Sequence, residues 1–317
     1  MLDRGEIDLV VYGTEPPAAL LECVELAEAT GLGGIWVGDS PVLWRELYVL
    51  LGAAAARTSR VRLGPAVTNP VSRHVAVTAS ALMTLQEVSG GRAALGLGLG
   101  ASAVRTVGAR PARLAELERA VADLRALWAG GAEGLAYGAS QPPIPVHLGA
   151  SGPRMLELSG RIGDGCLAVV GVRARQLEAA RERIASGAPR EGFELTFWVP
   201  FAIADDAAEA REAVKPYVAR SLRHPLPAEL TDVEREAAEA IQASYAYDQH
   251  LAPGAPQAQL VPDAIVGDWA VAGTPADCRE QLERLALEPG ERIGLVPMGP
   301  EAKLLHVRRL VDDVLRG

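Results

Sequence analysis

The chain has 317 residues, of which 31 are basic and 40 acidic, so that the net charge is −9. This balance, without any Lys/Arg-rich run, argues against nucleic acid or an anionic membrane as a partner, because phosphate binding needs concentrated positive charge. The hydrophobic fraction of 49% and the charged fraction of 22% are those of an ordinary globular protein with a sizeable core. We therefore expect a small-molecule ligand.

The three cysteines, Cys23, Cys166 and Cys278, are far apart and form no C-x-x-C pair. This pattern suggests neither a disulfide framework nor a zinc site, and we predict no metal. The N-terminal apolar run is too short for a secretory signal, and no stretch reaches the roughly 18 apolar residues of a membrane helix. We expect a cytoplasmic protein.

Short β-branched segments alternate with amphipathic segments along the whole chain. Eight strands are predicted, over 7–12, 34–38, 61–67, 93–99, 144–148, 166–170, 195–204 and 293–297. Helices are predicted between them, over 17–30, 44–58, 75–89, 111–128, 153–162, 175–186, 205–223, 275–287 and 300–315. The repeat unit is thus a strand followed by a helix.

Strands that are apolar on both faces and joined by helices imply a parallel sheet covered by helices. Eight such units favour a closed (β/α)₈ TIM barrel in the α/β class, with a doubly wound open sheet as the alternative. We predict one domain over 1–317, with an insertion at about 223–273 after strand seven. The insertion contains a charged helix over 231–247 and a Pro/Gly/Gln-rich surface loop over 252–262, and in a barrel it would act as a lid over the carboxyl-terminal mouth.

Two Gly-rich segments follow or form predicted strands. The segment LGPAVTNP, residues 63–70, indicates a distorted strand end where a ligand approaches the backbone, or an ordinary turn before a helix. In ALGLGLG, residues 94–100, glycine at every second position removes the side chains from one strand face, so that we expect something flat or bulky against it. A dinucleotide fingerprint is a weak interpretation, because these glycines do not open a helix.

A third segment, GASGPR at residues 149–154, joins the fifth strand to a helix. Small residues, Pro153 at the first helical position and the free N–H groups of the helix start favour an anion, with Ser151 as an additional donor. A plain helix cap is the alternative.

Candidates for acid/base chemistry are scattered. Asp39 ends the second strand and His74 opens a helix, both on the side where barrel active sites form. Tyr12, at the end of the first strand, is a further proton donor candidate, whereas His147 is interpreted as a buried structural histidine. No H-E-x-x-H, G-x-S-x-G or P-loop motif occurs, so zinc peptidase, α/β-hydrolase and P-loop chemistry have no support.

Taken together, residues 63–100, 143–168 and 271–285 resemble the bacterial luciferase-like superfamily of flavin and deazaflavin oxidoreductases. The T-N-P-x-x-R-H run from Thr68 and the G-D end of strand two resemble the coenzyme F420-dependent branch, which includes methylenetetrahydromethanopterin reductase. The resemblance implies a (β/α)₈ barrel with an insertion and a homodimer. It further implies a non-prolyl cis peptide between Ala66 and Val67 that backs the deazaflavin ring.

The same resemblance implies functional residues. Asp39, Trp44 and His74 are the candidates for catalytic or substrate-side roles. The positions that match cofactor-binding residues are Asp39, Ala66, Val67, Thr68, Leu99, Gly100, Gly149, Ala150, Ser151, Gly152 and Pro153. Ser40 and Ala101 occupy the positions of the base and acid of the glucose-6-phosphate dehydrogenase branch, which argues against sugar-phosphate oxidation.

The function expected from this resemblance is hydride transfer between C5 of the deazaflavin of coenzyme F420 and a small organic substrate. An FMNH₂-dependent monooxygenase, with FMN as the cofactor, is one alternative. A barrel that binds a flavin without turnover is another, because Ser40 and Ala101 lack acid/base chemistry.

Overall fold

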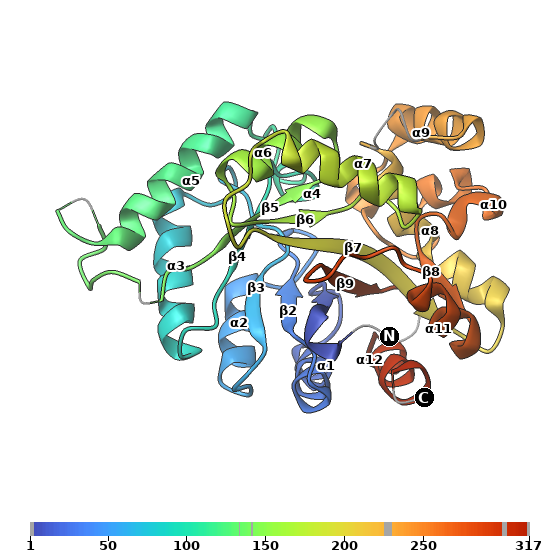
Figure 1. Ribbon diagram of the computed structural model, residues 1–317, viewed down its shortest axis with the longest axis horizontal. Coiled ribbons are helices and arrows are strands. Elements are labelled where there is room, and N and C mark those ends of the chain that lie inside the picture. Colours follow the sequence, from blue (N-terminus) through green and yellow to red (C-terminus); the bar gives the residue numbers. More distant parts are fainter. Residues whose placement is uncertain (1–2, 133, 141, 225–229, 300–302, 316–317) are drawn as a thin grey trace.

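Eight parallel strands form a nearly closed barrel surrounded by helices in the computed structural model, which describes residues 3–132, 134–140, 142–224, 230–299 and 303–315 (Figure 1). Neighbouring strands follow the order β3-β2-β1-β9-β7-β6-β5-β4, and isolated bridges pair Leu63 with Ala93 and Thr68 with Leu97 between the two ends. The barrel strands are β1 (Ile7–Val11), β2 (Gly34–Val37), β3 (Arg62–Pro65), β4 (Leu95–Leu97), β5 (Val146–Ala150), β6 (Gly165–Ala168), β7 (Glu194–Ile203) and β9 (Arg292–Pro297). The predicted TIM barrel is confirmed.

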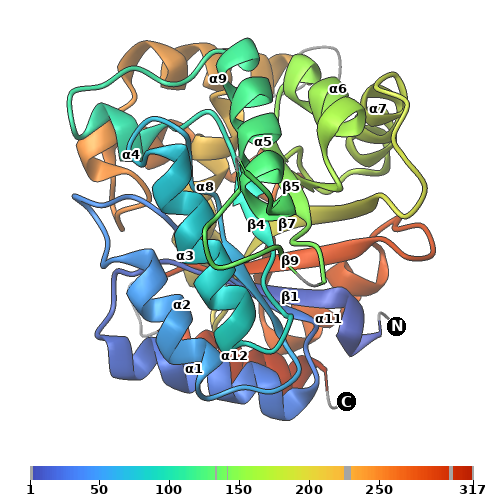
Figure 2. The ribbon, with the colours of Figure 1, turned by 90° about the vertical axis from the view of Figure 1, so that its left-hand side faces the viewer.

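Helices cover the outside of the barrel, and Figure 2 shows α1, α2, α3 and α5 following one another around it. Among the described residues the helices are α1 (Pro17–Thr30), α2 (Leu47–Ala55), α3 (Val75–Val88), α4 (Ser102–Arg105), α5 (Leu114–Ala129), α6 (Pro153–Ile162), α7 (Ala174–Ala185), α8 (Ala207–Leu222), α9 (Asp232–Ser244), α10 (Asp263–Val266), α11 (Pro275–Glu283) and α12 (Lys303–Arg309). Within the described ranges no helix combines the length and hydropathy needed to cross a membrane.

Alternate residues of each strand enter two different cores. In β1, Leu9 and Val11 pack outward in the core shared with the helices, whereas Val10 packs inside the barrel with Trp36 and Leu167. Both faces of a barrel strand are buried, which is why these strands are apolar almost throughout.

The floor of the barrel carries a buried ion pair. Asp8 of β1 is fully buried, and its carboxylate forms an ion pair with Arg292 of β9 and accepts a hydrogen bond of 2.9 Å from the Trp36 indole. Arg62 at the start of β3 and Glu194 at the start of β7 form a second ion pair at the same end of the barrel. Polar groups therefore close the end of the barrel opposite the mouth.

Most predicted elements lie where the pattern placed them. Each of the eight predicted strands overlaps an observed one, but β8 (Val271–Gly273), a short strand that pairs with the end of β7, was not predicted. The predicted helix over 44–58 begins only at Leu47, because Glu46 caps it by accepting a hydrogen bond from the Val49 N–H and Trp44 faces the mouth. The predicted helix start at Pro300 lies outside the described residues.

The insertion follows α8 and contains the expected charged helix as α9. Its 252–262 stretch, however, is not simply a surface loop. Ala255, Gln257, Ala258 and Val261 are buried, and a 3-10 turn over Pro256–Leu260 packs against α8. Small side chains let this turn approach the helix closely, which composition alone did not reveal.

Glu28 joins α1 to the loop before β3. Its carboxylate accepts hydrogen bonds from the backbone N–H groups of Ser59, Arg60 and Val61 and from the Ser59 hydroxyl. Burial alone would raise the pKa of Glu28, but these hydrogen bonds outweigh it and hold the pKa at about 2. The charged form of Glu28 therefore stabilises this corner of the barrel.

We expect Glu28→Gln to lower the free energy of unfolding at pH 7 by about 1–2 kcal/mol, since hydrogen bonds to a charged group are lost. Because folding lowers this pKa, the contribution is present above the unfolded value of 4.5 and disappears as the pH falls toward about 2. Urea denaturation at pH 7 and pH 3 measures this. A difference between variant and wild type that stays constant over this range would contradict the assignment.

Candidate functional site at the mouth of the barrel

The carboxyl ends of β2 and β3 bring two predicted site residues together. The Thr68 hydroxyl donates a hydrogen bond of 2.6 Å to Asp39 Oδ2, and both side chains are buried. Arg73 completes this group, with its Nε 3.2 Å from Asp39 Oδ2 and its Nη2 3.3 Å from Oδ1. The buried carboxylate is thus held in place and its charge is compensated.

Arg73 was not singled out by the sequence analysis. It also pairs with Glu46 at 2.6 Å, and its guanidinium lies 5.1 Å from the centre of the Tyr48 ring. Burial alone would lower the pKa of Arg73, but the hydrogen bonds and charges of Asp39 and Glu46 raise it above its usual value. Arg73 therefore stays charged.

The peptide bond between Ala66 and Val67, the position that the resemblance indicated, is cis. The Val67 side chain points across the mouth toward Gly98, which follows β4, and Gly149 of β5. A Cβ atom at Gly98 would lie 2.8 Å from Val67 Cγ2, and one at Gly149 would lie 2.9 Å from Val67 Cγ1. Glycine is required on both strands for this close approach.

This packing corrects the interpretation of the alternating glycines in β4. A Cβ atom at Gly96 would lie 2.2 Å from the Pro65 carbonyl oxygen, and Gly100, at φ +82°, faces Asn69 and Val104. What presses against the glycine face is the end of β3 itself. Leu99 and Gly100, both partly exposed, lie beside it at the mouth.

Gly149 and Ala150 end β5, and Ser151 and Gly152 connect them to Pro153, the first residue of α6. Gly152 is the residue before the helix, and no side chain caps this helix start. Nothing lies within 4 Å of the place where a Cβ of Gly152 would be, so the backbone is open to a ligand there. Free N–H groups and the helix dipole make this end suitable for an anion.

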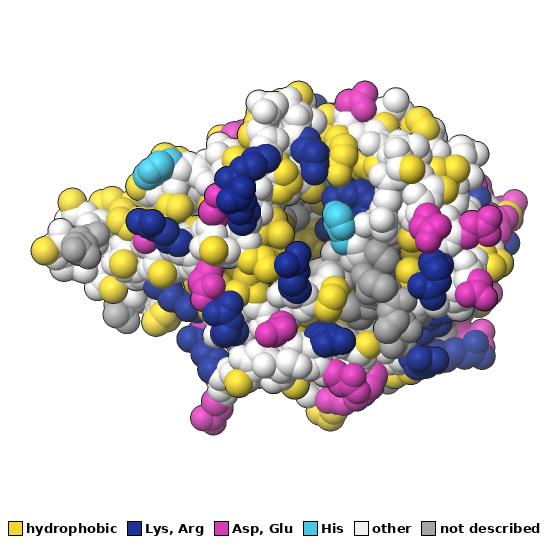
Figure 3. Space-filling model, turned by 90° about the horizontal axis from the view of Figure 1, so that it is seen from above, with side chains coloured by type: hydrophobic (Ala, Val, Ile, Leu, Met, Phe, Trp, Pro, Cys, Tyr) yellow, Lys and Arg dark blue, Asp and Glu magenta, His cyan; other side chains and the backbone are white. Residues whose placement is uncertain are grey.

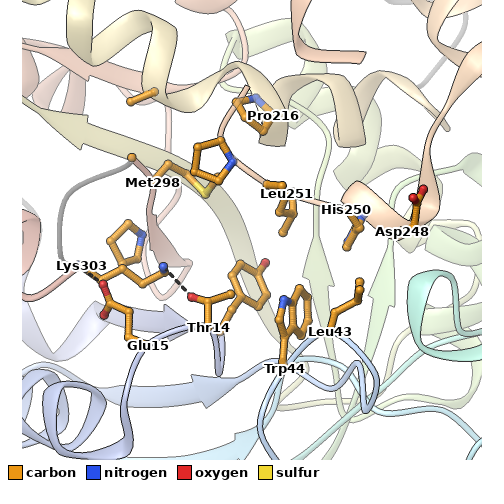
Figure 4. Close-up of a pocket in the computed structure, with 16 residues that line it drawn as sticks. Thr14, Glu15, Leu43, Trp44, Pro216, Asp248, His250, Leu251, Met298 and Lys303 are labelled. Carbon is orange, nitrogen blue, oxygen red and sulfur yellow. Dashed lines mark hydrogen bonds between the residues drawn. The ribbon is translucent and has the colours of Figure 1, made fainter. Parts of the chain in front are cut away.

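A cavity of about 360 Å³ occupies the other side of the mouth, at the ends of β1 and β9 and under the insertion. Trp44 and Leu43 face Leu251 and His250 across it, as Figure 4 shows. Its remaining lining residues are Tyr12, Thr14, Glu15, Ala213, Pro216, Asp248, Ala252, Pro253, Pro297, Met298, Gly299 and Lys303. The lining is largely apolar, with polar groups at a few points, as in small-molecule sites.

Aromatic rings line this cavity on both sides. The Tyr12 and Trp44 ring centres are 4.5 Å apart, and those of Trp44 and His250 are 5.9 Å apart. Burial, and then the neighbouring Tyr217, raises the pKa of Tyr12 well above its usual value. The pKa of His250 is lowered well below its usual value by burial and then by Arg220 and Arg223. Both side chains are therefore uncharged at neutral pH.

One end of the cavity carries two charged groups, Glu15 and Lys303. Lys303 Nζ donates a hydrogen bond of 2.9 Å to the Thr14 hydroxyl, drawn as a dashed line in Figure 4. Glu15 accepts a hydrogen bond from the Lys303 backbone at 2.7 Å. Burial lowers the pKa of Lys303, although the charge of Glu15 opposes this.

The structure does not bring His74 to the cavity. It is exposed and caps α3, with Nδ1 accepting a hydrogen bond of 3.2 Å from the Ala76 N–H. His147 is fully buried inside the barrel, 5.5 Å from the Trp36 ring, and burial lowers its pKa to about 4. The prediction of a buried structural histidine at position 147 is confirmed.

Part of the insertion spans the mouth, as expected of a lid. Tyr247 packs on Arg105, which follows β4, whereas His250 reaches Trp44, which follows β2. The insertion is itself anchored by Glu234 of α9, which is fully buried and accepts hydrogen bonds from Arg173 at 2.8 Å and from the Trp269 indole at 2.6 Å. The cover of the cavity is thus fixed to the barrel wall.

The protein is thus a TIM barrel whose carboxyl-terminal face holds a largely apolar cavity and, on the other side of the mouth, the Asp39–Thr68–Arg73 group. The sequence profile of the luciferase-like monooxygenase family matches residues 3–290, and the chain belongs to this family. The resemblance found in the sequence is thereby confirmed.

Relatives support this family placement, and a solved structure shares the fold. The chain is 30% identical over 309 residues to 5,10-methylenetetrahydromethanopterin reductase of Methanolobus tindarius, covering 90% of this chain and 93% of that protein. It is 32% identical over 237 residues to F420-dependent glucose-6-phosphate dehydrogenase of Beutenbergia cavernae, covering 65% and 70%. The structure of coenzyme F420-dependent tetrahydromethanopterin reductase from Methanopyrus kandleri superposes with a TM-score of 0.76 at 24% identity, covering 98% of both chains, which shows the fold.

Proposed function

We propose that the protein is a coenzyme F420-dependent oxidoreductase that transfers a hydride between C5 of the deazaflavin and a small organic substrate. The observation that carries this proposal is the buried Asp39 carboxylate, held by Thr68 and Arg73 at the ends of β2 and β3, on the same barrel face as the apolar cavity. The relatives named as F420-dependent reductases and dehydrogenases support it.

The residues present fit this cofactor on one half of the mouth. Asp39 and Thr68 are buried and place a charged carboxylate beneath a ring bound there, and the partly exposed Val67 offers an apolar surface for its face. The open, uncapped start of α6 at Gly152 suits a phosphate. These groups lie at the ends of β2, β3 and β5, whereas the cavity lies at β1 and β9, so cofactor and substrate would occupy neighbouring halves.

When bound, coenzyme F420 supplies the hydride-transfer chemistry. The chain's own residues orient the reactants and exclude water, with Trp44 and the insertion closing the substrate half. Tyr12 keeps its proton on the hydroxyl because burial raises its pKa, so it can orient a substrate by donating a hydrogen bond but is a weak acid for proton transfer.

Titration of the purified full-length protein with F420 and FMN, each oxidised and reduced, tests the proposal. We expect F420 to bind at least about tenfold more tightly than FMN, a difference of roughly 1.4 kcal/mol. Tighter binding of reduced FMN would instead support a monooxygenase, and binding of neither would contradict any flavin-type function.

We also propose that the protein forms a homodimer, as the resemblance implies. Val49 of α2 and Val77 and Val88 of α3 are exposed, and the two helices pack side by side. Exposed apolar side chains on two adjacent helices are compatible with an interface. We expect twice the 33.3 kDa of one chain in light scattering, and the monomer mass for Val49→Glu/Val77→Glu. A monomeric wild type would contradict the proposal.

A further inference from the structure

Three arginines gather beside the cavity, where the insertion meets the barrel. Arg220 and Arg223 lie at the end of α8, and Arg105 ends α4. The guanidinium groups of Arg105 and Arg223 lie 4.6 and 4.8 Å from the centre of the same ring, that of Tyr247. Arg223 also lies 4.7 Å from the Tyr245 ring centre. We call Arg105, Arg220, Arg223, Tyr245 and Tyr247 the arginine–tyrosine cluster.

The charge of this cluster is not compensated within the described part of the chain. There, none of the three arginines forms an ion pair with a carboxylate, unlike Arg73, whose guanidinium meets two. Arg223 is only 8% exposed and its Nε, among these residues, has no hydrogen-bond partner. A buried guanidinium without a counter-charge is costly, so the site favours an anion.

The imidazole of His224, next to Arg223, carries no charge at neutral pH. Partial burial and the charges of Arg223, Arg220 and Arg105 lower the pKa of His224 to about 4. His224 Nε2 lies 3.2 Å from an Arg223 nitrogen and is a neutral neighbour at pH 7. The positive charge therefore belongs to the arginines alone.

The cluster is directly connected to the cavity. The Tyr245 hydroxyl lies 2.7 Å from Nδ1 of His250, which lines the cavity opposite Trp44. The charge of Arg220 also acts on Tyr12, which lines the cavity beside Trp44. In the view of Figure 3, Lys and Arg side chains gather around a hollow with hydrophobic atoms in its floor. An apolar cavity with cations at its edge suits a molecule with an apolar body and an anionic end.

We propose that the arginine–tyrosine cluster binds a carboxylate or phosphate group of the substrate, whose apolar part occupies the cavity. This inference rests on the proposed function, because it assigns the cavity to the substrate and not to the cofactor. Guanidinium groups suit this task, since their paired N–H donors match the geometry of both anions. The substrate class is thus that of small organic acids or phosphate esters.

The test compares benzoate with its uncharged counterpart benzamide by calorimetric titration of the full-length protein. We expect benzoate to bind more tightly than benzamide, and Arg223→Met or Arg220→Met to weaken benzoate binding at least about tenfold while leaving benzamide binding unchanged. Arg211→Met, on the same helix α8 but outside the cluster, is the matched control and should bind benzoate as the wild type does. Equal binding of benzoate and benzamide, or full benzoate binding by the cluster variants, would overturn the proposal.

Titration with F420 in the same samples separates this proposal from the proposed function and identifies the source of the anion. If benzoate binding depends on Arg223 although F420 does not bind, the substrate subsite stands and the cofactor assignment fails. If Arg223→Met weakens F420 as strongly as benzoate, the cluster holds the cofactor's phosphate, and the substrate assignment is overturned. NMR of the His224 imidazole gives a readout without ligand, since its pKa should rise from about 4 when Arg223 is removed.

Discussion

Arg292→Met is expected to lower the free energy of unfolding by about 3–5 kcal/mol, because it leaves a buried carboxylate without its counter-charge. Asp8 is fully buried, and in the wild type it is satisfied by Arg292 and by the Trp36 indole. Methionine replaces most of the arginine's apolar stem but not its charge, and one neutral donor remains for the carboxylate. Urea denaturation at pH 7 measures the loss.

The control for this prediction is an exposed pair of the same residue types. Arg57 and Glu25 are 3.2 Å apart with about half of each side chain exposed, so Arg57→Met should cost less than about 1 kcal/mol. Asp8→Asn/Arg292→Met should recover part of the loss, because the unpaired charge is gone. An Arg292→Met protein as stable as Arg57→Met would show that the floor of the barrel does not depend on this pair.

The barrel was predictable because its signals are local. Alternation of β-branched runs and amphipathic segments placed all eight barrel strands, and α6 was predicted with its observed bounds, Pro153–Ile162. The short strand β8 was missed because three residues carry no periodicity of their own. It forms where the long strand β7 extends past the barrel and offers Phe201–Ile203 for pairing.

The site was predictable only where the chain order brings residues to strand ends. Asp39, Thr68 and Gly149–Pro153 follow three strands, and parallel strands place their carboxyl ends on the same face. Arg73 lies in the same T-N-P-x-x-R-H run as Thr68, but its partner Asp39 is 34 residues away. The pairing of Arg73 with Asp39 is therefore visible only in the folded barrel.

The arginine–tyrosine cluster was still harder to predict from the sequence. Arg105 and Tyr247 are far apart in sequence, and neither lies in a recognisable motif. Their contact depends on how the insertion crosses the mouth, which is a property of α8, α9 and the buried anchor at Glu234. Insertions vary most among proteins of one fold, so this part of the site needs the structure.

Asp39→Asn is expected to weaken F420 binding about 10- to 100-fold, because a charged acceptor that offers roughly 1.5–3 kcal/mol becomes neutral. Asparagine keeps the size of the side chain and an oxygen for the Thr68 hydroxyl, but it loses the charge and puts an N–H₂ group in place of the oxygen that accepts from Arg73 Nη2. The cavity wall at Trp44 is left intact. Fluorescence titration of F420 with the purified variant measures the dissociation constant.

Glu46→Gln provides the matched control, because Glu46 is the second carboxylate on Arg73 and does not contact Asp39. It removes an ion pair from the same guanidinium but leaves the Asp39–Thr68 group in place, so F420 binding should stay within about twofold of the wild type. If both variants lost affinity equally, the effect would come from displacing Arg73. If neither did, Asp39 would have only a structural role at the end of β2, and the cofactor would depend on the α6 loop and Val67 alone.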